Sequence, residues 1–169
     1  MTNNPRRVIP IIRSRKEKTT MSVGQYCNRH VVTTERGTGI QEIARIMRQR
    51  HVGTVVVVER RNDKEYPVGI ITDRDLVVEV MGQGLSPETL TVADVMTSNL
   101  VTAHEEDNFW RALDRLSAKG VRRLPVIDND GALIGILTVD DVLTALAVGL
   151  SDVTRLVQRE IAKEVQQRQ

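Results

Sequence analysis

Two threonine–aspartate pairs have the residue types and the spacing to bind a phosphorylated sugar. Thr138 and Asp141 lie three positions apart, directly after a short apolar run, and Thr72 and Asp75 repeat this arrangement earlier in the chain. An apolar run that leads into such a pair predicts a buried strand followed by a helix. The N-terminus of a helix offers free N–H groups to phosphate, the hydroxyl adds a donor, and the carboxylate can accept hydrogen bonds from a ribose diol.

The same pairs also have a purely structural interpretation. A threonine at the start of a helix, with an acid three positions on, forms a capping pair that satisfies the first backbone N–H groups of the helix. One pair alone leaves both interpretations open, and both can hold at once. The flanking sequence must therefore decide which function is expected.

The chain is a duplication, and this is why the strand-to-helix corner occurs twice. Val32 and Val101 are 69 positions apart, as are Val52 and Val121, whereas the two threonine–aspartate corners are 66 positions apart. The first copy therefore has three extra residues, and they fall in the polar loop 60–66. A change of length confined to a loop is what a duplicated domain tolerates.

The residue pattern of each copy predicts the element order strand, helix, strand, strand, helix. The helices are predicted from apolar residues at i, i+3, i+4 and i+7, starting from Ile40 in the first copy and from Phe109 in the second. Two β-hairpins follow these helices, with predicted strands at 55–58 and 68–71, and at 124–127 and 133–137.

The division into domains follows from the duplication. We predict a basic N-terminal extension at 1–20, two repeats at 21–84 and 85–149, and a C-terminal helix at 150–169. The last segment has Val153, Leu156, Val157 and Ile161 on one helical face. A single amphipathic helix must bury that face, so we expect it to pack on the repeats or on another copy of the chain.

Composition limits the class of protein. The chain is 40% hydrophobic but only 2% aromatic, so its core must be built from aliphatic side chains. Its single cysteine, Cys27, excludes an internal disulfide and is most simply a small buried residue. No apolar run approaches the roughly 20 residues of a membrane span, so we expect a cytoplasmic protein with no membrane partner.

Charge is concentrated at one end of the chain. Residues 1–20 have six basic side chains and one acidic one, a net charge of +5, and the remainder has 18 basic and 21 acidic side chains, a net charge of −3. A mildly acidic body argues against a broad nucleic-acid surface, so nucleic acid is an unlikely partner there. A phosphate-binding or nucleic-acid-binding role for residues 1–20 stays open beside that of a solvated terminus.

With the duplication in place, the chain resembles a tandem pair of cystathionine-β-synthase (CBS) domains, the Bateman module. The resemblance rests on the two corners and on the segments 92–97 and 120–128, and it covers about residues 22–147. It implies an α+β fold in which two βαββα repeats pack through their sheets with pseudo-twofold symmetry, here followed by a C-terminal amphipathic helix. It also implies a homodimer, which is common in the family.

The resemblance implies an adenosine nucleotide as regulatory ligand, with AMP or ATP favoured over NAD or S-adenosylmethionine, in two clefts between the repeats. The residues that it assigns to one cleft are Thr138, Asp141, Ile136, Arg122, Arg123, Val32, Val52 and Gly53. The residues that it assigns to the other cleft are Thr72, Asp75, Val101 and Val121, with Arg74 close by.

We expect the cleft with Thr138 and Asp141 to bind more tightly. Arginine binds phosphate oxygens through two parallel hydrogen bonds, and the arginines at 122 and 123 are replaced by Gly53 and Thr54 at the equivalent positions of the first copy. Gly53 is expected to permit close approach of the backbone to the ligand. The base preference stays open, because segment 25–28 departs from the family phrase that its counterpart 94–97 retains.

The leading hypothesis is a regulatory module that senses a nucleotide and acts on an unknown regulated protein. It is not expected to be an enzyme or to need a cofactor or a metal, because its three histidines are scattered and it has no P-loop or G-x-G-x-x-G motif. One alternative is a ligand-free dimerising scaffold. The other is a protein that binds nucleic acid through residues 1–20.

Overall fold

Each copy of the repeat folds into a three-stranded sheet with a helix before its hairpin and a helix after it. The computed structural model describes residues 21–167. The first copy comprises α1 (Val23–Tyr26), β1 (Thr33–Thr34), α2 (Ile40–Arg50), β2 (Thr54–Arg61), β3 (Lys64–Thr72), α3 (Asp73–Asp75) and the π-helical η1 (Leu76–Met81). The second comprises α4 (Val92–Val95), β4 (Ala103–His104), α5 (Phe109–Lys119), β5 (Arg123–Ile127), β6 (Leu133–Thr138) and α6 (Val139–Gln167).

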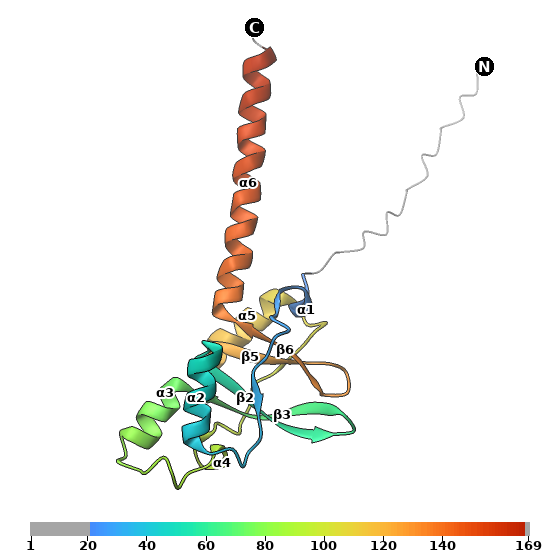
Figure 1. Cartoon of the computed structure of the whole chain (residues 1–169). Helices are drawn as coiled ribbons and strands as arrows, with labels where there is room; N and C mark the ends of the chain where they lie inside the picture. The colour runs from blue at the N-terminus through green and yellow to red at the C-terminus, as the bar shows by residue number, and fades with distance from the viewer. Residues whose placement is uncertain (1–20, 168–169) are drawn as a thin grey trace, which may run out of the picture.

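The two sheets have the same topology. Their strand orders are β1-β2-β3 and β4-β5-β6, with a short outer strand parallel to its neighbour and an antiparallel hairpin. The two hairpins lie beside each other, and a long helix continues from the second sheet (Figure 1). The predicted α+β fold of two βαββα repeats with a C-terminal helix is therefore confirmed.

Helix periodicity decides which side chains fill the core of each copy. The apolar face of α2 buries Ile40, Ile43 and Met47 against its own sheet, and α5 buries Phe109 and Leu116 in the same way. Both cores are otherwise aliphatic, as the scarcity of aromatic residues predicts.

The opening segments of the two copies are exchanged. Val23 and Cys27 lie in the core of the second sheet, whereas Val92 and Met96 lie in the core of the first. Backbone hydrogen bonds fix this exchange: the N–H of Val23 donates to the Asp107 carbonyl at 2.9 Å, and that of Val92 donates to the Thr38 carbonyl at 2.8 Å. The predicted domain boundaries stay a prediction, but each core contains residues from both sides of them.

A glycine on the last strand of each sheet makes room for the exchanged segment. A Cβ atom on Gly135 would lie 2.8 Å from the Cys27 Sγ and 3.0 Å from the Asn28 carbonyl oxygen. Gly69 faces the Met96 side chain in the equivalent place. The interior position predicted for Cys27 is confirmed, and burial raises the pKa of its thiol.

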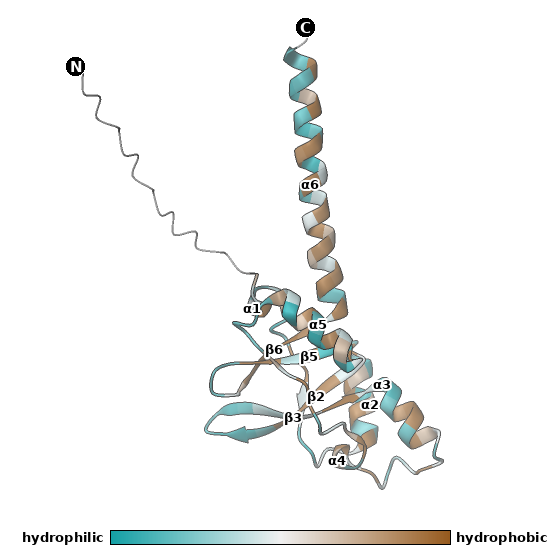
Figure 2. Ribbon diagram, turned by 180° about the vertical axis from the view of Figure 1, so that it is seen from behind, coloured by the Kyte–Doolittle hydropathy of each residue, from teal (hydrophilic) through white to brown (hydrophobic). Residues whose placement is uncertain are grey.

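The C-terminal helix differs from the prediction. No separate helix starts near residue 150, because α6 runs without interruption from Val139 through Gly149 to Gln167. Glycine in the interior of a helix costs only about 1 kcal/mol relative to alanine, which is too little to end a helix. The first turns of α6 pack on the second core through Val142, and the rest of the helix extends away from the two sheets (Figures 1 and 2). The predicted apolar face of Val153, Leu156, Val157 and Ile161 is therefore exposed in the described residues.

Residues 1–20, the predicted basic extension, lie outside the described residues. Between residues 21 and 167, no helix combines the length and the hydropathy needed to cross a membrane. The same range contains no group of three or more histidine, cysteine or carboxylate side chains placed to hold a metal ion.

Candidate functional site

Both threonine–aspartate pairs are helix caps. The Thr72 N–H and hydroxyl each donate to the Asp75 Oδ2 at 2.8 Å, and the Thr138 N–H and hydroxyl donate to the Asp141 Oδ2 at 2.8 and 2.7 Å. The structural interpretation is thus confirmed at both corners. The cap uses one carboxylate oxygen, and the remaining oxygen of each aspartate accepts no hydrogen bond from the described residues.

The pair alone does not define a binding site, because a third copy of it occurs elsewhere. Thr91 and Asp94 form the same cap at the start of α4, with distances of 2.8 and 2.7 Å. These hydrogen bonds hold the pKa of Asp94 below its usual range. What distinguishes the other two caps is the cleft beside each of them.

The larger cleft lies between the first corner and the start of the second hairpin. Its volume is about 490 Å³, which is within the range of small-molecule sites. Its lining residues are Ile70, Thr72, Asp73, Arg74, Asp75, Thr97, Asn99, Leu100, Val101, Gly120, Val121, Arg122, Arg123 and Pro125. We refer to it as the Thr72 cleft.

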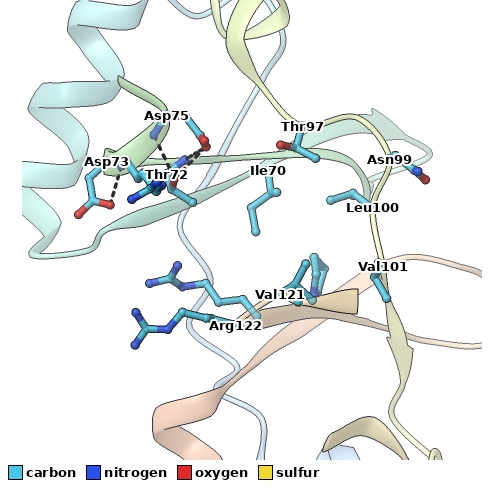
Figure 3. Close-up of a pocket in the computed structure, with 14 residues that line it drawn as sticks. Ile70, Thr72, Asp73, Asp75, Thr97, Asn99, Leu100, Val101, Val121 and Arg122 are labelled. Atoms are coloured by element: carbon cyan, nitrogen blue, oxygen red, sulfur yellow. Dashed lines mark hydrogen bonds between the residues drawn. The ribbon is translucent and has the colours of Figure 1, made fainter. Parts of the chain in front are cut away.

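Apolar and charged groups occupy different parts of the Thr72 cleft. In Figure 3, Ile70, Leu100, Val101 and Val121 lie toward one end, and the Thr72–Asp75 corner lies at the other. The first group offers a surface for a flat apolar ring, and the second offers hydrogen-bonding groups.

Three guanidinium groups line this cleft. Arg122 extends toward the Thr72–Asp73 corner in Figure 3, and Arg74 and Arg123 are also part of the lining. Among residues 21–167, none of the three forms a salt bridge with a carboxylate within 4.0 Å. Since an unpaired arginine beside the N-terminus of a helical segment is suited to phosphate, the charged end of the cleft can hold an anion.

The smaller cleft is the pseudo-symmetric counterpart, and we refer to it as the Thr138 cleft. Its volume is about 190 Å³, and its lining includes the predicted residues Val32, Val52, Gly53, Ile136, Thr138 and Arg123. Asp140 lines it in place of Asp141. Asp141 lies instead on a separate groove beside Gln25 and Tyr26.

The prediction that Arg122 belongs to the cleft of Thr138 and Asp141 is wrong. Its backbone is at that corner, since its carbonyl accepts a hydrogen bond from the Val139 N–H at 3.1 Å. Its side chain, however, points across to the first copy and lines the Thr72 cleft. The arginine charge that was expected to make the Thr138 cleft the tighter site therefore favours the Thr72 cleft instead.

The space beside Gly53 also differs from the expectation. A Cβ atom there would lie 2.9 Å from the Asp73 Oδ2, and the Gly53 carbonyl accepts a hydrogen bond from the Asp73 N–H at 3.1 Å. The glycine therefore makes room for a carboxylate of this chain at that point. The lining of the Thr138 cleft thus has one arginine and one carboxylate, whereas the lining of the Thr72 cleft has three arginines and two carboxylates.

Sequence reasoning missed several lining residues of the Thr72 cleft, notably Asn99, Leu100 and Asp73. The repeat offset could have found two of them, because Asn99 and Leu100 are the counterparts of His30 and Val31, which line the other cleft. The offset also pairs Arg74 with Asp140, so this charge difference between the two clefts was present in the sequence.

Comparison with known proteins agrees with this architecture. The family model described as the CBS domain matches residues 23–82 and 92–148. An uncharacterised protein of Methanopyrus kandleri is 41% identical over 73% of this chain, which spans 61% of that protein's length.

Two solved structures share the fold. A conserved protein from Pyrococcus horikoshii is 26% identical, with a TM-score of 0.66 over 75% of this chain and 92% of its own. The cytosolic domain of the Mg²⁺ channel MgtE, solved in complex with ATP, is 26% identical, with a TM-score of 0.62 over 73% of this chain and 48% of its own. Because the family model matches both repeats, this chain belongs to the CBS domain family.

Proposed function

We propose that this chain is a regulatory module that binds an adenosine nucleotide in the Thr72 cleft. The observation that carries the proposal is that Arg74, Arg122 and Arg123 line one cleft together with a capped helix start, with Arg122 extending toward that start and apolar side chains lying toward the other end. The apolar end suits the base, the free Asp75 oxygen suits the ribose hydroxyls, and the arginines suit the phosphates.

The comparison with MgtE supports the ligand class. That channel domain has been solved with ATP, at 26% identity to this chain. Charge favours ATP or AMP over S-adenosylmethionine in the Thr72 cleft, because three guanidinium groups attract phosphate and oppose a sulfonium cation. The Thr138 cleft, which is smaller and has one arginine in its lining where the Thr72 cleft has three, is expected to bind nucleotide more weakly.

The proposed output is a change in how the two repeats pack. Both repeats contribute to the wall of the cleft, so a bound ligand that prefers one spacing of the corners shifts the population toward it. The regulated protein would detect that change. Action by binding, without catalysis, is part of the proposal.

Calorimetric titration of the full chain with AMP, ATP, NAD and S-adenosylmethionine tests the function directly. We expect the tightest binding for ATP or AMP, and we expect Arg122→Ala to weaken it roughly 10- to 100-fold, because a hydrogen bond to a charged group is worth about 1.5–3 kcal/mol. Arg111→Ala is the matched control, since Arg111 is an exposed arginine of α5 outside the cleft.

Two results would contradict the proposal. Affinities no better than millimolar for all four ligands, with a melting temperature that no ligand raises, would favour the ligand-free scaffold. Equal losses for Arg122→Ala and Arg111→Ala would mean that the nucleotide binds elsewhere. Binding that falls steeply with salt and disappears on deletion of residues 1–20 would instead favour the N-terminal extension.

A further inference from the structure

The helix α6 has a continuous apolar stripe that no other described residue covers. The side chains that form this α6 stripe are Leu143, Leu146, Leu150, Val153, Val157, Ile161 and Val165, and each is between 38 and 68% exposed. Figure 2 shows apolar positions recurring along the helix to its far end, well beyond the two sheets.

The spacing of the α6 stripe identifies the shape of its partner. Successive members are 3, 4, 3, 4, 4 and 4 residues apart. The intervals from Leu143 to Leu150 are those of a heptad seam, and the step from Leu150 to Ile161 is an 11-residue period. The two periods drift in opposite directions around a straight helix, so together they keep the stripe on one face. From Leu143 to Val165 the stripe is roughly 33 Å long at 1.5 Å per residue. A surface of this length and period fits another long helix.

Charge argues against a lipid surface and against nucleic acid as the partner. Between residues 150 and 167, Asp152, Glu160 and Glu164 balance Arg155, Arg159 and Lys163, so this part of α6 has no net charge. A helix that lies on a lipid surface or on nucleic acid needs a basic polar face. The basic residues 1–20 gain no electrostatic attraction from it either, whereas an identical helix is not repelled.

We propose that the α6 stripe is the contact between two copies of this chain, with their α6 helices packed along each other. A second copy supplies an apolar stripe of the same length and period, with no net charge to oppose the contact. The proposal also accounts for the helix itself: an isolated segment as long as the projecting part of α6 is only marginally helical in water unless an apolar face is packed.

Sedimentation equilibrium of the full-length chain tests this contact. We expect the wild type to be dimeric, and we expect the double variant Leu150→Glu/Val157→Glu to weaken the dimer by roughly a hundredfold, because each change buries an unpaired charge. Val148→Glu is the matched control. Val148 is 57% exposed on the opposite face of α6, so this variant should have the same dimer dissociation constant as the wild type. Since the stripe packs on neither sheet, all three chains should retain the same folded repeats.

Cysteine cross-linking gives a second measurement that does not depend on weakened association. Val153 lies near the middle of the stripe, so Val153→Cys meets its counterpart whether the two helices run parallel or antiparallel. We expect rapid disulfide-linked dimers for Val153→Cys and none for Val148→Cys. The native Cys27 is buried and should not contribute.

Three outcomes would overturn the proposal. They are a monomeric wild type at all concentrations, a dimer constant that the Leu150→Glu/Val157→Glu change leaves unaltered, and equal cross-linking at 148 and 153. A dimer that survives the stripe changes but is lost on deletion of residues 1–20 would assign the contact to the N-terminal extension.

Discussion

Single residues distinguish two clefts that the duplication made equivalent. Arg122 and Arg123 stand where the first copy has Gly53 and Thr54, and Arg74 stands where the second has Asp140. The repeat backbone is the same at both corners, and so is the threonine–aspartate cap. The chemistry of each cleft therefore depends on the few side chains around the cap, and the cap itself is a structural feature.

The buried thiol of Cys27 gives the stability of the fold a defined dependence on pH. Burial raises the pKa of this thiol above its ordinary value, because the thiolate would lose its hydration. The unfolded chain therefore loses this proton at lower pH than the folded chain does. The contribution of Cys27 to stability is complete at pH values below the pKa of the thiol in the unfolded chain. It decreases as the pH rises through the pKa of the thiol in the folded chain.

Urea denaturation between pH 7 and pH 10.5 can measure this dependence, with Cys27→Ala as the reference chain that has no thiol to titrate. We expect the stability difference between wild type and variant to shrink as pH rises. A difference that stays constant across the range would show that the thiol titrates equally in both states.

At the scale of elements, the predictions that rest on local patterns were confirmed. The two hairpins fall within β2–β3 and β5–β6, and the helices start at Ile40 and Phe109, because period-2 and period-3.6 patterns are local properties of the chain. The direction of the Arg122 side chain was not predictable in this way. It depends on how the two copies face each other, which no pattern within one copy records.

The end of the second repeat shows a local pattern that led to a wrong helix boundary. The prediction placed a separate helix at 150–169, after a repeat that ends at residue 149, but the structure has a single helix across Gly149. A glycine ends a helix when the chain must turn to bury the next segment, and the sequence does not record where that segment packs. The amphipathic face was therefore predicted correctly, but the start of the helix that contains it was not.

Close packing of each exchanged segment against the last strand of a sheet can be tested at Gly135. Gly135→Ala places a methyl group against the Cys27 Sγ and the Asn28 carbonyl, and overpacking of this kind typically costs 1–3 kcal/mol of unfolding free energy. Chemical denaturation measures this loss.

The control for that experiment is Gly149→Ala, because a Cβ atom at Gly149 meets no atom within 4 Å. This variant should be neutral or up to about 1 kcal/mol more stable, since alanine favours the helix. Equal effects of the two substitutions would contradict the close approach at Gly135.

At the scale of the whole molecule, the exchange of opening segments makes the two repeats one folding unit. Each core lacks apolar side chains unless the other repeat supplies its opening segment, as Val23 and Met96 illustrate. We therefore expect urea unfolding to be a single transition, with the fluorescence of Trp110 in the second repeat coinciding with far-ultraviolet circular dichroism of the whole chain. Two separate transitions, or a stable isolated segment 21–84, would contradict this expectation.

The exchange also sets the order of events during synthesis on the ribosome. Val23 and Cys27 are among the first described residues to emerge, but their core partners Leu124 and Leu137 emerge near the end of the repeats. The first core, in turn, cannot close until Met96 has left the exit tunnel. Apolar side chains that are synthesised early thus stay exposed in the nascent chain until their core partners have been synthesised, and such exposure favours aggregation. Synthesis of the last hairpin is therefore the step that lets the second core close.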